Sequence, residues 1–148
     1  MKLLWPLDKV FITQKFGANP LVYKKFGLNG HDGLDMRTRF FDSPLGKRYV
    51  TAVADGVIEE VRYDVKGYGI HIRQRLSNGD LFIYGHLTKP YVGPKTSVKA
   101  GQRIGLTGNS GFSSAPHLHV ELRPKNEPKD NGYYGAVDPL KHFGPLPT

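Results

Sequence analysis

Cysteine is absent from the 148-residue sequence, and so is any long apolar run. The first absence excludes disulfide bonds and metal sites built on thiolates. The second argues against a membrane-spanning stretch. Because Pro6 and Asp8 interrupt the apolar N-terminal segment, we also expect that this segment is not a secretory signal peptide. Low-complexity tracts are also missing, so we expect the chain to fold. Its length fits one domain, residues 1–148, without a linker.

Charge is unbalanced, with 21 lysine and arginine residues against 13 acidic ones and a formal net charge of +8. A positive surface favours anionic partners, such as anionic cell-wall polymers, although a solvated basic surface explains the charge equally well. No basic run exceeds two residues, and no nucleic-acid-binding motif occurs. We therefore expect neither nucleic acid as a partner nor insertion into a membrane.

Glycine and proline are scattered along the chain, with 18 and 11 residues, and turn signals recur at short spacing. No helical apolar period lasts more than about two turns, which favours many short strands. Residues 56–63, 69–76 and 81–87 have the strongest strand patterns, and Asn78-Gly79 predicts a hairpin between the last two. We predict an all-β fold class: a mostly antiparallel sheet with little helix and with long loops that form a groove.

Weaker patterns complete this prediction. They indicate strands within 9–17, 98–108 and 117–124, a loop over 125–135, and one short helical turn after Pro139. Within the segment 81–87, alternation predicts that Phe82, Tyr84 and His86 share one face of the sheet.

Two histidines and a glutamate alternate in the segment PHLHVE, at His117, His119 and Glu121. Residues two apart in a strand point to the same side, so these three ionisable groups are expected on one face. In such a strand one imidazole can bind a metal while its neighbour reaches the open coordination position. The spacing alone leaves open which histidine does which.

A second pair lies in the segment HDGLD, where His31 and Asp35 flank Gly33. In an extended stretch all three face one way, and the glycine is expected to leave room for an ion between the outer side chains. His86 adds a further histidine at a strand end. Two histidines and one carboxylate suit a catalytic zinc, which keeps one position for water or substrate. Zinc lowers the pKa of bound water to about 7, and further histidines can transfer protons or stabilise the charged intermediate.

Four motifs, HDGLD, YGHL, TGNSG and PHLHVE, occur in the order seen in the zinc endopeptidases of the lysostaphin and LytM type, the M23 peptidases. The chain resembles this family from about Gln14 to Leu140, and VTAVADGVI, VKAGQRIG and VDPL resemble its connecting segments. A single histidine–aspartate pair is a weak motif, whereas all three histidine-bearing motifs in this order are specific. No H-E-x-x-H sequence occurs, which argues against a thermolysin-like protease.

The resemblance implies roles for five residues. His31, Asp35 and His119 bind one zinc ion, and His86 and His117 are catalytic. It implies a zinc metalloendopeptidase that hydrolyses peptidoglycan in a cross-bridge or stem peptide and acts as a monomer at the bacterial cell wall. The absence of a signal peptide favours a phage lysin or an incomplete chain over a secreted wall enzyme or bacteriolysin.

Three rival hypotheses were weighed. A non-catalytic wall-binding or regulatory module of the same family is disfavoured because all five expected positions are present. A non-haem iron oxygenase also uses two histidines and a carboxylate, but it leaves His86 and His117 without a role. A biotinyl or lipoyl carrier domain is suggested by VKAGQRIG alone, and it leaves the histidines unexplained.

Other residues have structural explanations that compete with functional ones. Glu121 is expected to be an ion-pair or hydrogen-bond partner, with orientation of a metal ligand as the alternative. Tyr84 is either packed on the sheet or part of the groove, and His71 is expected to face solvent with its neighbouring arginines. Asn109 and Ser110 are turn formers that could contact substrate. Residues 19–30 either form a groove wall or bind wall polymer, or else they are a packed connecting loop, and His142 has no predicted role.

Overall fold

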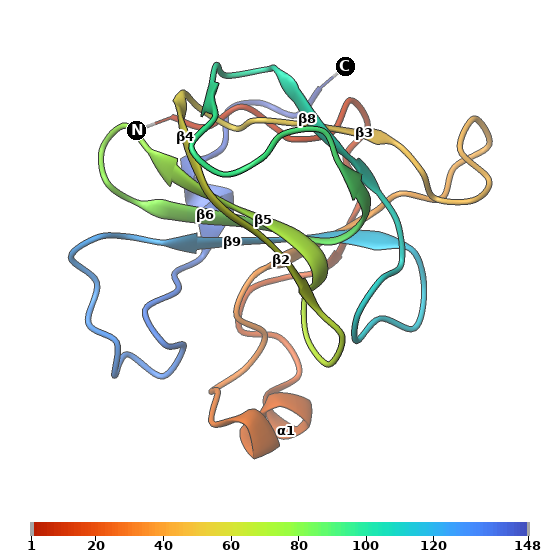
Figure 1. Cartoon of the computed structure of the whole chain (residues 1–148). Helices are drawn as coiled ribbons and strands as arrows, with labels where there is room; N and C mark the ends of the chain where they lie inside the picture. Colours follow the sequence, from red (N-terminus) through yellow and green to blue (C-terminus); the bar gives the residue numbers. More distant parts are fainter. Residues whose placement is uncertain (1, 148) are drawn as a thin grey trace.

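The computed structural model describes residues 2–147, and an antiparallel sheet dominates this part of the chain (Figure 1). Its strands follow the order β1-β2-β9-β6-β5-β4-β7, while β8 pairs with both β6 and β3. The strands are β1 (Ile12–Gln14), β2 (Leu34–Arg37), β3 (Tyr49–Thr51), β4 (Gly56–Asp64), β5 (Gly69–Leu76), β6 (Leu81–Pro90), β7 (Ser97–Val98), β8 (Arg103–Thr107) and β9 (His117–Arg123). The predicted all-β, mostly antiparallel fold is confirmed.

Helical structure is limited to short segments within the described residues. These are the α-helix α1 (Pro20–Tyr23) and the 3₁₀ turns η1 (Lys24–Phe26) and η2 (Pro139–His142). The turn η2 begins at the predicted proline, and the Asp138 carboxylate accepts a hydrogen bond from Leu140 N at 3.0 Å. Among residues 2–147, no helix has the length and apolar character needed to cross a membrane.

The central hairpin forms as the sequence predicts. Strands β5 and β6 are joined by the turn that contains Asn78 and Gly79, where Gly79 N donates to Leu76 O at 2.9 Å. The predicted strand within 98–108 is interrupted, because Gln102 N donates to Lys99 O at 3.0 Å in a turn that separates β7 from β8. The predicted strand within 9–17 is shorter than expected and retains only β1.

Strand β9 separates the core from the functional face. Leu118, Val120 and Leu122 are at most 2% exposed and belong to the hydrophobic core. The intervening side chains, from His117 to Arg123, therefore point to the opposite face of the sheet. The core fixes this strand by apolar burial, and the alternation then determines which groups face the groove.

Strand β6 departs from alternation at its bulge. Ile72 pairs with Tyr84 and Ile70 with Leu87, so three steps along β6 face two steps along β5. His86 absorbs the extra residue with a left-handed backbone, φ 62°. Tyr84 and Leu87 point into the core, whereas His86 is turned toward the groove. The prediction that His86 shares the face of Phe82 and Tyr84 is therefore wrong, because the bulge re-aims its side chain.

Candidate active site

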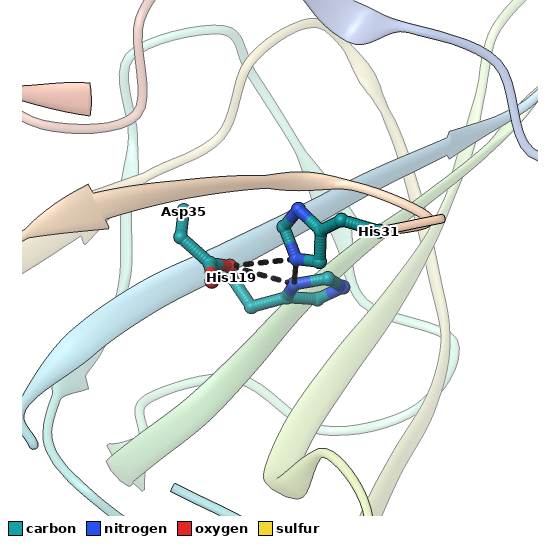
Figure 2. Close-up of side chains that lie close together, drawn as sticks. All are labelled: His31, Asp35 and His119. Atoms are coloured by element: carbon teal, nitrogen blue, oxygen red, sulfur yellow. Dashed lines mark hydrogen bonds and ion pairs between the residues drawn. The ribbon is translucent and has the colours of Figure 1, made fainter. Parts of the chain in front are cut away.

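Antiparallel pairing brings the two ligand-bearing motifs together. Asp35 in β2 lies directly opposite His119 in β9, and His31 enters from the loop before β2 (Figure 2). Asp35 Oδ1 lies 2.8 Å from His119 Nδ1 and 3.3 Å from His31 Nε2. His31 Nε2 and His119 Nδ1 are themselves 3.3 Å apart. Three atoms that could coordinate a metal, all from buried side chains, thus lie close together, although the residues are as much as 88 positions apart in the sequence.

The remaining ring nitrogens define which atoms are free for a metal. His31 Nδ1 is 3.2 Å from Lys15 O, and His119 Nε2 is 2.9 Å from Glu121 Oε1. Both partners are acceptors, so each of these nitrogens donates. In a neutral ring the other nitrogen, which faces Asp35, then keeps its lone pair for a metal, and without a metal it can instead carry a proton that it donates to Asp35. In a tetrahedral site with bonds of about 2.0–2.1 Å, neighbouring zinc ligands lie about 3.3 Å apart. The residues present therefore fit a zinc ion in donor chemistry and in spacing.

Gly33 has a different role from the one predicted. A Cβ atom at Gly33 would lie 2.3 Å from Val120 O and 2.6 Å from His119 Cε1. The absent side chain therefore makes room for strand β9 and for the ring of His119, and not for an ion between His31 and Asp35. Close approach of β2 to β9 is what allows the two motifs to share one site.

The carboxylates of Asp35 and Glu121 on either side of His119 create a negative field that favours positive charge in the cluster. Burial alone would raise the pKa of Asp35, but hydrogen bonds from His119 and His31 outweigh burial and lower that pKa well below its ordinary value. Burial disfavours a charge on His119, yet hydrogen bonds to Asp35 and Glu121 raise its pKa well above the ordinary value. The same field that draws a proton to His119 would favour a bound cation.

The other two predicted residues lie beside this cluster. The rings of His86 and His117 have centroids 4.6 Å apart, and His117 Nε2 lies 3.7 Å from Asp35 Oδ2. His86 Nδ1 is 2.7 Å from Ser110 O and His117 Nδ1 is 2.9 Å from Ala115 O, so each Nδ1 donates to a carbonyl. Nε2 of each ring is then the nitrogen left for a substrate or water. Burial, followed by the nearby His117, lowers the pKa of His86 to about 4, so His86 is neutral at pH 7.

All five side chains line one groove of about 710 Å³. Residues 19–30 contribute Tyr23 and Phe26 to the lining of this groove, and Phe112 joins them there. The Phe26 and Phe112 rings meet edge to face with centroids 6.4 Å apart. Of the explanations proposed for residues 19–30, the groove wall is the one that the structure supports.

Two other residues are now placed. Tyr84 is fully buried and belongs to the core, where its hydroxyl donates to Gln74 Oε1 at 2.6 Å and accepts from Val53 N at 3.0 Å. His71 is only 1% exposed, so the prediction that it faces solvent is wrong. The ring of Tyr68 lies 5.0 Å from it, and Arg73 Nε donates to its Nε2 at 3.2 Å, so these two side chains cover it.

Two groove residues lie outside the sequence prediction, and a third residue, beside the groove, has a role that the prediction did not assign. Tyr68 and Asp32 line the groove but were not among the candidates, because a loop position offers no periodic signal. Ser110 was predicted as a turn former that could contact substrate, whereas in the structure its carbonyl orients His86 and its hydroxyl accepts from Ile70 N at 3.0 Å. Asn109 and His142 gain no functional assignment.

Comparison with known proteins points to one family. The model described as peptidase family M23 matches residues 29–131. Peptidoglycan DD-endopeptidase ShyA of Vibrio cholerae is 37% identical over 117 residues, 76% of this chain and 26% of its own length. DD-carboxypeptidase/endopeptidase Mpg of Neisseria meningitidis is 33% identical over 126 residues, 76% of this chain and 27% of its own. This chain therefore spans less than a third of either relative.

A solved structure resembles nearly the whole chain. The catalytic domain of the antimicrobial peptidase lysostaphin from Staphylococcus simulans superposes with a TM-score of 0.72 and 29% identity. The match covers 89% of this chain and 90% of that one. The resemblance noted from the sequence motifs is confirmed by these comparisons.

Proposed function

The chain belongs to peptidase family M23, and we propose that it is a zinc-dependent endopeptidase that hydrolyses peptide bonds in peptidoglycan. One observation carries this proposal. Three metal-binding side chains converge beside His86 and His117, and all five line a single open groove. A groove of this kind can admit an extended peptide and present its carbonyl to a metal and to proton-transfer groups together.

The metal would be held by His31 Nε2, an Asp35 carboxylate oxygen and His119 Nδ1. When bound there, zinc polarises the scissile carbonyl and lowers the pKa of a water ligand to about 7. The protein contributes the orientation of these three donors, since each histidine is tied through its second nitrogen to an acceptor.

His86 and His117 supply the proton transfers in this proposal. One of the two takes the proton of the attacking water at its unprotonated Nε2 and later returns it to the leaving amine. The other stabilises the oxyanion when its Nε2 also carries a proton and can donate a hydrogen bond. Ser110 O and Ala115 O hold the two rings through their Nδ1 atoms, so both Nε2 atoms stay directed at the groove. Asp35 connects the proposed metal ligands with the two proton-transfer histidines, because its Oδ2 lies 3.7 Å from His117 Nε2.

The proposed substrate is the peptide part of peptidoglycan, either a cross-bridge or a stem peptide, and the site of action is the bacterial cell wall. Relatives named as peptidoglycan endopeptidases and the structural likeness to lysostaphin support this substrate class. The net charge of +8 also favours an anionic wall. A non-catalytic module is the weaker alternative, because it leaves the three converging metal ligands and the two neighbouring histidines without a role.

Digestion of purified walls tests the proposal. Walls from several bacterial types would be incubated with the zinc-loaded protein, and the released fragments identified by mass spectrometry. We expect fragments with newly formed peptide ends, none after chelation, and release about 10²–10⁴-fold slower with His117→Ala. Binding to the walls without release of any peptide fragment would instead favour the non-catalytic alternative.

A further inference from the structure

Glu121 lies beside the proposed metal-binding cluster, and so far it has entered only as the acceptor that faces His119 Nε2. Its side chain is fully buried, yet it accepts hydrogen bonds from three groups. His119 Nε2 lies 2.9 Å and the Tyr68 hydroxyl 2.7 Å from Oε1, and Arg123 Nε lies 2.9 Å from Oε2. A buried carboxylate is costly unless such partners compensate it, so its contact with a metal-binding histidine needs an explanation.

The contacts around Glu121 form a closed ring. Arg123 donates a second hydrogen bond, from its terminal guanidinium nitrogen to the Tyr68 hydroxyl, at 2.9 Å. Tyr68 therefore accepts from Arg123 and donates to Glu121, and neither carboxylate oxygen can move without breaking a bond. The ring fixes Glu121 in the position from which it meets the imidazole of His119.

We propose that Glu121 is a positioning residue for the metal site: it accepts a hydrogen bond from the Nε2–H of His119, which keeps the proton on Nε2 and leaves the lone pair on Nδ1 for the metal. Nδ1 is the atom that faces Asp35 and His31. The negative charge also makes the imidazole a stronger ligand. Tyr68 and Arg123 act one step further out, by holding the carboxylate. The inference rests on the proposed function, since it assumes that a metal binds at this cluster.

The two histidines of the cluster differ in a way that sharpens the inference. His31 Nδ1 donates to a neutral backbone carbonyl, Lys15 O, at 3.2 Å. His119 Nε2 instead donates over 2.9 Å to a carboxylate, and a charged acceptor makes a stronger bond. Glu121 is thus the only charged acceptor that, among residues 2–147, hydrogen-bonds the outer nitrogen of a candidate ligand histidine.

The test is the zinc affinity of Glu121→Gln, measured by competition with a chromophoric chelator. We expect the dissociation constant for zinc to rise by about 10–100-fold, the range found when such outer partners are changed. Tyr68→Phe removes one hydrogen-bond donor to the Glu121 carboxylate but keeps the aromatic side chain, so it should weaken zinc binding by less. Glu59→Gln is the control, because it removes a carboxylate that pairs with Arg75 at 2.8 Å on the exposed side of the sheet.

A second readout separates positioning from a structural role. Long-range ¹⁵N–¹H spectra of the zinc-loaded wild type should show His119 protonated at Nε2 and metal-bound at Nδ1. An unchanged zinc affinity in Glu121→Gln, with only the melting temperature of the chelated protein lowered, would overturn the proposal. Should Glu121→Gln fail to fold, unchanged zinc affinity in Tyr68→Phe would overturn it as well. A wild type that binds zinc but digests no walls would refute the endopeptidase and leave this inference intact.

Discussion

The groove has two halves, one that we propose binds the metal and one that we propose transfers protons, and they are built by different means. The metal-binding half is formed by regular pairing of β2 with β9, where Asp35 and His119 are direct cross-strand neighbours. The proton-transfer half depends on irregular backbone: His86 sits at a bulge with φ 62°, and His117 is oriented by the carbonyl of Ala115 just before its strand. Strand register therefore governs the first half, and loop packing governs the second.

Loop packing beside His86 is unusually close. The His86 N–H donates to Tyr68 O at 2.6 Å, and Phe112 N donates to Gly67 O at 2.9 Å. At Gly111, which has φ 77°, a Cβ atom would lie 2.2 Å from Gly69 N. Two loops thus lock together around His86, whereas the metal cluster is held mainly by strands. Changes in the loops should alter proton transfer without abolishing metal binding, and changes between β2 and β9 should do the opposite.

The largest effect is expected from Asp35→Ala, which removes the donor shared by both halves. Loss of the metal would remove several kcal/mol of transition-state stabilisation, on the order of 10⁴-fold in rate. Zinc content by mass spectrometry and wall digestion should both fall to background. The exposed Asp130→Ala serves as the control. One zinc per chain in Asp35→Ala would place the metal elsewhere.

The next largest effect is expected from His86→Ala and His117→Ala. Each should lower the rate of wall digestion by about 10²–10⁴-fold, because each removes a proton-transfer or oxyanion-stabilising group. Zinc affinity by chelator competition should stay near that of the wild type, with His142→Ala as a histidine control. Loss of zinc from either variant would erase the distinction between the two halves.

Gly33→Ala tests the strand-built half. The added methyl would press on Val120 O and on the ring of His119, so we expect a loss of about 1–3 kcal/mol in unfolding free energy. Zinc affinity should fall too, because the ring of His119 must shift. Urea denaturation of the chelated protein and chelator competition measure the two effects. Unchanged zinc affinity would argue against close β2–β9 packing.

Gly111→Ala is the matching change in the loop-built half. A left-handed backbone and the nearby Gly69 both oppose a side chain there, with an expected cost of about 1–3 kcal/mol. Here the turnover rate should fall while zinc affinity is retained, because the strain falls on the loops that orient His86. A variant that loses zinc but keeps normal rates when reloaded would reverse the assignment of the two halves.

The smallest effect concerns His71, which lies outside both halves. Burial, opposed by a hydrogen bond to Gly69 O and assisted by Arg73, lowers the pKa of His71. The unfolded chain therefore takes up this proton near pH 6.5 while the folded protein does not, so stability falls as pH drops below that value. In urea denaturation with chelator, His71→Gln should show a shallower loss between pH 7 and 5. An equal slope would contradict the assignment.

The contrast between strand register and loop packing also explains how much of the site the sequence predicts. Alternation in PHLHVE places His117, His119 and Glu121 on one face, and the structure has this arrangement because the core side chains of β9 enforce it. Asn78-Gly79 likewise predicts its hairpin from local turn chemistry. These features depend on short-range patterns, which a single sequence contains.

Features that depend on distant contacts were beyond the sequence. The bulge at His86 arises from its pairing with β5, and alternation alone therefore placed that side chain on the wrong face. His71 was expected at the surface because nothing local reveals the ring of Tyr68 above it. The Tyr68 hydroxyl donates to Glu121, which lies 53 positions later in the sequence, and no sequence motif predicts that contact.

A crystal structure with anomalous diffraction at the zinc edge tests the central claim most directly. We expect a single anomalous peak bounded by His31 Nε2, Asp35 Oδ1 and His119 Nδ1, with the rings of His86 and His117 nearby and not bonded to the metal. A peak held instead by His86 and His117, or by Asp32 and Glu121, would contradict the account of how the two halves divide the chemistry.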